Sequence, residues 1–177
     1  DVSIGPDGPG GLAFVRRFGS GANGHNYDLA LYQNSVSGVW TANAGLRSFE
    51  FGLSGTTYVS RDGSGATLVK TGTAHTLTTA EGIRIVYDYN FRDQLSSPAR
   101  TSLATSITYP TGEKETIAYN RVVFCTDPQD ICGQPQDFQT AVRLQSVSSS
   151  LGYQLHLNYA GSQISHWSEA DAYRRLV

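Results

Sequence analysis

The stretch SITYPTGEKETIAYN, residues 106–120, has a near copy forty positions later in SVSSSLGYQLHLNYA, residues 146–160. Both copies have a branched apolar residue second, Gly seventh, an apolar residue twelfth and Tyr fourteenth. A duplicated pattern of this length predicts a repeated structural unit. The matched pairs are Ile107 and Val147, Gly112 and Gly152, Ile117 and Leu157, and Tyr119 and Tyr159.

Each copy has the pattern of one β-hairpin. In the first copy a strand runs into Pro110, Thr111 and Gly112, where proline fixes φ and glycine permits the positive φ of a tight turn. The chain then returns through Glu115 to Tyr119. In the second copy Ser150, Leu151 and Gly152 take the place of the turn.

An earlier half-copy lies at residues 82–90, where Gly82 and Tyr89 are seven apart, like Gly112 and Tyr119. A lone hairpin cannot bury its apolar face, so the units are expected to stack side by side in one sheet. We therefore expect repeat-turn roles for Gly82, Gly112 and Gly152, and packing roles for Tyr89, Tyr119 and Tyr159.

The remaining sequence is also typical of β-structure, with 19 Gly, 10 Tyr and 7 Phe among 177 residues. Alternation is clearest at residues 83–90, which indicates one mainly apolar face. We predict an all-β fold, an antiparallel sheet of successive β-hairpins that coils, with one short helical turn near residues 168–176. Further strands are expected at 11–18, 27–33, 46–53, 56–63, 66–72 and 75–82.

Size and charge limit the possible functions. The length favours a single β-rich unit over residues 1–177, with leading hairpins at 1–80 and repeats at 81–177. A net charge of −2, with Lys and Arg scattered, gives no basic field for nucleic acid. No apolar run reaches the roughly 18 residues of a membrane helix. The absence of Met leads us to expect a processed or trimmed part of a longer protein.

These residues resemble a known family, the RHS or YD-repeat proteins. The resemblance rests on the order strand, turn Gly, strand ending in Tyr-Asp or Tyr-Asn, and then Gly and Ile opening the next unit. The preceding half is similar to the segment that leads into the repeats of many bacterial members, in GPGGLAFVRRFGSG (8–21), HNYDLAL (25–31) and DGSGATLVKTG (62–72). The resemblance extends from about Gly8 to Trp167.

The resemblance implies a β-sheet spiral that forms part of a hollow shell, often around a C-terminal toxin domain. A chain of this size would supply only part of such a wall, with toxin cargo expected only if it belongs to a full shell. The sequence departs from the family in lacking the autoproteolytic motif that closes the shell. Self-cleavage and toxicity are therefore not carried over to these residues.

Both cysteines lie in an insert, residues 121–143, that separates the two copies. Cys125 and Cys132 are seven apart across Asp-Pro and Gly turn signals, which favours a disulfide that closes a small loop. Two reduced thiols are the alternative, whereas a zinc site is disfavoured by the spacing and the lack of a nearby His. A disulfide implies an extracellular or cell-surface location, with the periplasm also open.

No catalytic, cofactor or metal site is expected from the other motifs. The four histidines are dispersed and lack the helical spacing of a hydrolytic metal site. Asp127 and Asp130 lack the alternating carboxylates of a calcium loop, and the Gly-rich stretches at 5–11 and 19–24 are not followed by a Lys-Ser/Thr pair. The Ser cluster at 146–150 is not part of a nucleophile elbow.

Two functions remain open. The favoured one is structural, an RHS-like β-shell or β-fibre that encloses or presents a partner, or that assembles with further β-structure through strand edges near 11–18 and 161–167. The alternative is an extracellular module that binds glycans or a surface, which only its aromatic and Ser/Thr-rich faces support. Packing is the better explanation of the aromatic residues at repeat-linked positions, which are Tyr87, Tyr89, Tyr119, Tyr159 and Trp167. An enzyme is not expected, because no nucleophile, base and orienting residue can be assembled.

Overall fold

The structure is a computed structural model that describes residues 1–17, 24–90, 100–125 and 138–158. All regular structure in these residues is β, and most of it forms antiparallel hairpins, which confirms the predicted fold class. No helix occurs in the described ranges, and the short helical turn expected near 168–176 lies outside them. The strands are β1 (Val2–Ile4), β2 (Leu12–Phe14), β3 (Arg16–Arg17), β4 (Gly24–His25), β5 (Ala30–Gln33), β6 (Trp40–Ala44), β7 (Arg47–Ser54), β8 (Thr57–Ser60), β9 (Thr67–Thr71), β10 (Ala74–Thr78), β11 (Arg84–Tyr89), β12 (Arg100–Thr108), β13 (Lys114–Cys125), β14 (Phe138–Ser149) and β15 (Gln154–His156).

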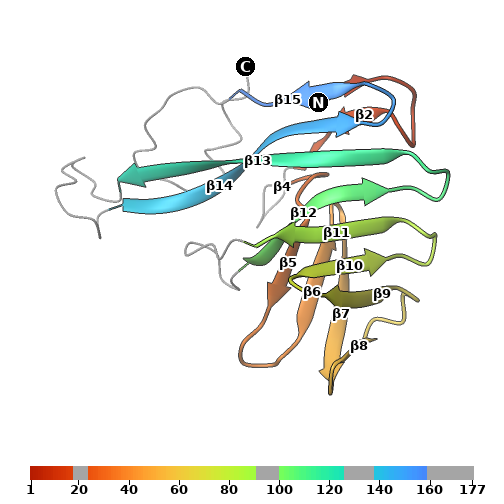
Figure 1. The fold of residues 1–177 in the computed structure, drawn as a ribbon, viewed down its shortest axis with the longest axis vertical. Helices are drawn as coiled ribbons and strands as arrows, with labels where there is room; N and C mark the ends of the chain where they lie inside the picture. The colour runs from red at the N-terminus through yellow and green to blue at the C-terminus, as the bar shows by residue number, and fades with distance from the viewer. Residues whose placement is uncertain (18–23, 91–99, 126–137, 159–177) are drawn as a thin grey trace.

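Two meanders make up the main sheet. The strands β5 to β8 form the first, and β9 to β15 form the second, each strand pairing with the next along the chain. The strands of the first meander run across those of the second (Figure 1). The two are joined because β5 pairs with β12, a contact between residues about seventy positions apart in the chain.

Strand β12 is the branch point of the sheet. One edge pairs with β11, while the other pairs with β5 at Arg100–Leu103 and with β13 at Ser106–Thr108. Because β5 occupies part of that edge, β13 leaves β12 after Thr116 and continues with β14 alone. The β13–β14 ribbon therefore extends beyond the rest of the described sheet (Figure 1).

This ribbon contains the ends of the insert expected at residues 121–143. Arg121–Cys125 and Phe138–Arg143 are paired strand residues, ending in the pair Cys125 and Phe138. The β-branched and aromatic residues at 122–124 favour strand, and the Asp-Pro and Gly turn signals fall only within 126–137. The pairing of these segments as strands was not predicted from the sequence.

Three hairpins of the second meander have the same turn. In β10–β11, β12–β13 and β14–β15, the glycine N–H donates to the carbonyl three residues before it, at 2.9, 3.0 and 2.9 Å. The residue at the start of each turn donates its N–H to the carbonyl four residues later, at 2.9, 2.9 and 2.8 Å. The repeat is therefore present in the backbone three times, including the half-copy. The starting residues are Thr79, Tyr109 and Ser149.

The core lies between the two meanders. Leu31 and Phe51 from the first meander and Leu77 from the second are all fully buried. Tyr87 is also fully buried, and its hydroxyl donates to the carbonyl of Asn43 at 2.7 Å, which ties the repeats to the leading segment. Burying each such side chain contributes roughly 1.5–3 kcal/mol.

Strand β6 is a part of this core that the sequence pattern missed. Its middle residue, Ala42, is fully buried between Leu31 of β5 and Phe49 of β7. The strand is short, and three of its five residues, Ala42, Asn43 and Ala44, are of types depleted in strands, so its propensity for strand is weak. Packing against its two neighbours explains why it is a strand.

Candidate functional site

A cavity of about 480 Å³ opens where the turns of the two meanders and the N-terminal segment meet. Its walls are mainly apolar, from Leu12, Leu29, Phe49, Ile85 and Ile107. The sheet supplies one wall, the β6–β7 turn a second, and residues 6–9 a third. Concave apolar sites with a few polar groups are the usual form of small-molecule sites in proteins.

One carboxyl group lies in this apolar wall. Leu77, Ile85, Ile107 and Glu115 face one another in successive strand pairs, so Glu115 continues a row of core residues across β10 to β13. Glu115 is only 2% exposed. Its position in the repeat is held by an apolar residue in the other two hairpins, Ile85 and Leu155.

The carboxyl group of Glu115 is only half satisfied. The hydroxyl of Tyr109 donates to Oε1 at 2.7 Å. The other oxygen, Oε2, is buried and has no hydrogen-bond partner among the described residues. The hydroxyl of Tyr27 lies near the same group and also lines the cavity, but it does not form a hydrogen bond that satisfies Oε2.

Burial controls the titration of these three groups. It raises the pKa of Glu115 above its ordinary value, although the two tyrosine hydroxyls oppose this shift by stabilising the carboxylate. Burial likewise raises the pKa of Tyr27 and Tyr109 far above 10, and the nearby carboxylate adds to both shifts. Both tyrosines are therefore hydrogen-bond donors throughout the neutral range.

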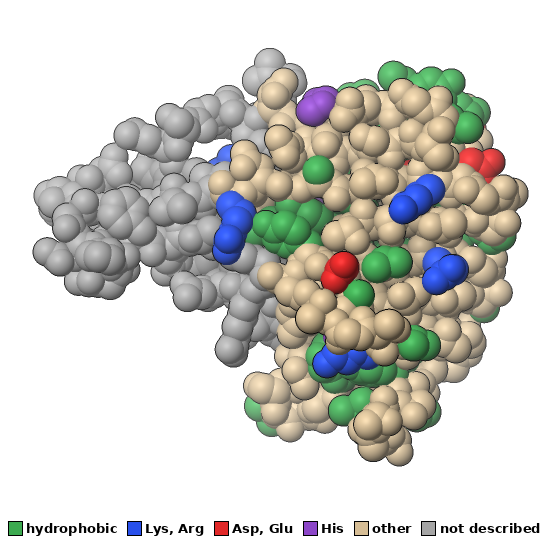
Figure 2. All heavy atoms as spheres, in the orientation of Figure 1, with side chains coloured by type: hydrophobic (Ala, Val, Ile, Leu, Met, Phe, Trp, Pro, Cys, Tyr) green, Lys and Arg blue, Asp and Glu red, His purple; other side chains and the backbone are tan. Residues whose placement is uncertain are grey.

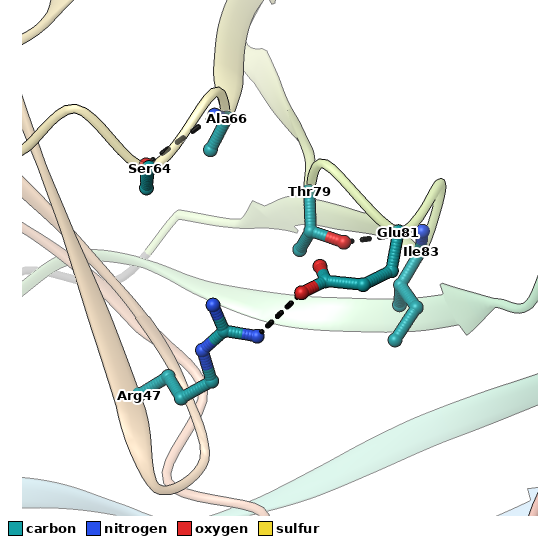
Figure 3. A network of polar contacts seen from close by, with 6 residues as sticks. All are labelled: Arg47, Ser64, Ala66, Thr79, Glu81 and Ile83. Atoms are coloured by element: carbon teal, nitrogen blue, oxygen red, sulfur yellow. Dashed lines mark hydrogen bonds and ion pairs between the residues drawn. The ribbon is translucent and has the colours of Figure 1, made fainter.

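An exposed ion pair joins two turns at the rim of the cavity. Arg47 Nη1, from the start of β7, lies 2.9 Å from Glu81 Oε1 in the β10–β11 turn (Figure 3). The hydrogen bond from Arg47 is the main cause that lowers the pKa of Glu81 to about 2. Thr79 and Ile83 of the same turn line the cavity, and Thr79 Oγ1 accepts the N–H of Ile83 at 3.3 Å. Because Arg47 is paired with Glu81, its charge is partly compensated at the rim.

The Gly-rich stretch at 5–11 forms a cover that packs on the third hairpin. Ser149 Oγ donates to the carbonyl of Gly10 at 2.6 Å. Gly10 has a φ of 87°, and a Cβ there would overlap the side chain of Leu151. The positive φ and the close approach of Leu151 explain why residue 10 is a glycine, and a phosphate ligand is not needed to explain it.

The structure describes the three glycines for which the repeat predicts turn roles, and two of the three tyrosines for which it predicts packing roles. Gly82, Gly112 and Gly152 occupy the three equivalent turns with φ of 84°, 100° and 90°. The rings of Tyr89 and Tyr119 are 5.3 Å apart between centroids, and the Tyr119 hydroxyl donates to the carbonyl of Ala104 at 2.8 Å. Tyr159 lies outside the described residues.

The predicted disulfide falls largely outside the described structure. Cys132 is not among the described residues, and for Cys125 only the backbone is placed, at the end of β13. The disulfide between them therefore stays a prediction. Asp127, Asp130 and Trp167 also lie outside the described residues.

An aromatic cluster forms around Trp40 of β6. Its ring meets Tyr58 edge-on at 5.5 Å and His75 at 5.2 Å, and the Tyr58 hydroxyl is 2.9 Å from His75 Nε2. Burial lowers the pKa of His75, and the charge of Lys70 adds to this effect. The described contacts of Trp40 are those of a packed side chain.

Charges and metal-binding groups are dispersed. Figure 2 shows single Lys, Arg, Asp and Glu side chains lying apart on the visible face. In the described ranges, no three His, Cys, Asp or Glu side chains are placed to hold a metal ion. The same part of the chain contains no helix of the length and hydropathy that a membrane span requires.

No family model, curated protein or solved structure matches this chain. The sequence pattern placed Glu115 only on the return strand of a hairpin and missed its role in the cavity. The available signal was the repeat itself, because aligning the three units sets a carboxylate against Ile85 and Leu155. Nothing in the pattern indicated that Tyr27 would lie near it.

Proposed function

We propose that this chain is a structural β-unit of the RHS or YD-repeat kind, a segment of a longer β-wall that encloses or presents a partner. The observation that supports this proposal most directly is that three successive hairpins have the same turn and lie side by side in one sheet. Stacked repeats of this type bury a continuous core by adding neighbours, so further units can be added at the end of the array.

The two end strands of the main path through the described sheet support this proposal. Among the described strands, β15 pairs only with β14, and β8, at the other end of the main path, pairs only with β7. A strand edge with unpaired backbone groups is suited to accept another strand. The other edge expected from the sequence differs, because β2 pairs with β1 in a small separate sheet, and residues 161–167 lie outside the described structure.

The partner of these edges is further β-structure, either from additional repeats of a parent chain or from an identical subunit. We place the protein outside the cell or on its surface, as the predicted disulfide implies. Toxin cargo is expected only if the chain belongs to a full shell. The glycan-binding alternative has less support, because Trp40 is packed against Tyr58 and His75.

Blocking the edge of β15 tests the proposal. Residues 153 and 157 bond to β14, so His156, one position away, directs its N–H outward. Proline at position 156 would remove this donor without breaking the ladder to β14. Sedimentation at micromolar concentration, with negative-stain imaging, should show assembly of the wild-type chain, loss of assembly for His156→Pro, and retained assembly for the control His156→Ala.

Two results together would contradict the proposal. The first is a wild-type chain that stays monomeric. The second is a reading frame that contains no further repeats on either side, where a repeat is a strand, a turn glycine and a second strand ending in tyrosine. Assembly that is unchanged in His156→Pro would instead exclude the β15 edge as the contact.

A further inference from the structure

The half-satisfied Glu115 carboxyl is costly for a purely structural unit. Burying a carboxylate oxygen without a hydrogen-bond partner destabilises the folded state, and the cost rises if the group is charged. The equivalent positions in the other two hairpins hold Ile85 and Leu155, so the repeat accepts an apolar residue there. The fold therefore does not require a carboxylate at residue 115.

In the described part of the chain, the groups that stabilise the Glu115 carboxylate are two tyrosines. Tyr109 bonds Oε1, and Tyr27 lies nearby, so neither contributes a positive charge. Arg47, which lines the same cavity, is held by Glu81 at the rim. Among the described residues, the carboxylate therefore has an unused acceptor and no cation that compensates its charge.

Glu115 is one of the residues that line the cavity, and this cavity can hold a small molecule. Its volume is about 480 Å³, and Leu29, Phe49 and Ile107 give it an apolar interior. A ligand there must be mostly apolar, with a hydrogen-bond donor placed at Oε2. A protonated amine supplies both the donor and the missing positive charge, and such charge-assisted hydrogen bonds are about twice as strong as neutral ones.

We propose that this cavity binds a compact apolar molecule bearing one amino group, and that the amine donates to Glu115 Oε2. The inference is independent of the structural function, because it concerns the interior of the unit and not its edges. The role of Glu115 is to bind and orient the ligand, and no chemical step is implied.

Three probes that share a cyclohexylmethyl group and differ in their polar group test the proposal. They are cyclohexylmethylamine, cyclohexylmethanol and methylcyclohexane. Binding is measured by calorimetry and ligand-observed NMR at about pH 8, where a simple alkylamine is still protonated. We expect the amine to bind at least about tenfold more tightly than the alcohol, because only the amine makes a charged hydrogen bond. The hydrocarbon should bind most weakly.

Three variants locate the site. Glu115→Gln should weaken amine binding at least about tenfold and change alcohol binding little, because the charge is lost while the amide keeps a polar group with which a hydroxyl can pair as donor or acceptor. Ile83→Trp fills the cavity from a half-buried position at the rim and should abolish binding of all three probes. Glu50→Gln removes an exposed carboxylate outside the cavity and should change nothing.

The outcomes separate clearly. Amine binding that is equal in the wild type and in Glu115→Gln, or that survives Ile83→Trp, would overturn the proposal, as would tightest binding of the hydrocarbon. If Glu115→Gln fails to fold by circular dichroism, Ile83→Trp and the ranking of the three probes on the wild type still decide the question.

Discussion

The hairpins β12–β13 and β14–β15 have the same backbone turn but different interiors. In the first, the turn begins at Tyr109, whose hydroxyl reaches Glu115 beside the cavity. In the second, the equivalent residues are Ser149, which bonds the carbonyl of Gly10, and Leu155, which packs against the core. The two hairpins thus share a backbone turn and differ at two side-chain positions, because Tyr109 and Glu115 line the cavity whereas Ser149 and Leu155 do not.

The largest expected difference between the two hairpins concerns the burial of their matched apolar residues, Ile117 and Leu157. Ile117 is 4% exposed, whereas its counterpart Leu157 is only partly buried beside the core. We expect Ile117→Ala to lower the free energy of unfolding by about 2–5 kcal/mol, and Leu157→Ala by less than half as much. Urea denaturation of both variants measures this. Equal losses would show that the two hairpins are packed equally well.

The second expected difference comes from the buried carboxyl group of Glu115, which the second hairpin replaces with Leu155. Glu115→Gln should raise the free energy of unfolding by roughly 1–3 kcal/mol near pH 8. Burial raises the pKa of Glu115, so the folded wild type keeps its proton at pH values where the unfolded chain has lost it. Wild-type stability then falls as the pH rises from about 4.3 through the folded pKa. The advantage of Gln should therefore disappear near pH 4, as denaturation at several pH values would show.

The control for this pH effect is Leu155→Gln, which places the same polar side chain in the second hairpin. It should lower stability by an amount that does not change with pH, because no titrating group is removed. A pH-independent effect of Glu115→Gln would contradict the burial of an ionisable carboxyl at that position.

The turn glycines should respond alike, which tests the shared backbone. Gly112 and Gly152 both have positive φ, and a Cβ at either would meet no atom within 4 Å. Alanine should therefore cost about 1–2 kcal/mol at each site through backbone strain alone. Thermal unfolding compares the two. A much larger loss at one glycine would mean that the two turns differ in packing as well as in sequence.

The smallest expected effect is at the rim of the cavity. Arg47 and Glu81 are largely exposed, so Arg47→Gln should lower the melting temperature only slightly. The difference from the wild type should vanish at about 1 M salt, where charges are screened beyond about 3 Å. A large loss that persists in high salt would show that Arg47 stabilises the fold through a contact other than the ion pair, such as the Phe49 ring, whose centroid lies 5.2 Å from its guanidinium carbon.

Much of the fold could be predicted from the sequence. The alternation of apolar residues and the glycine of each turn are local properties, and they indicated the hairpins β12–β13 and β14–β15 with their turns at Gly112 and Gly152. Strand β6 was missed because its local propensity is weak. The pairing of Arg121–Cys125 with Phe138–Arg143 was not predicted either, because turn signals lie between these two segments.

The sequence by itself determined the repeat, because turn geometry and strand alternation depend on residues close together in the chain. Only the tertiary structure decided that β5 pairs with β12, so that the two meanders enclose a core. It also decided the site, because Tyr27 approaches Glu115 from the leading segment and the cavity forms where distant turns meet. Burial of the Glu115 carboxyl depends on which apolar surfaces meet across the fold, and this is a property that no local pattern contains.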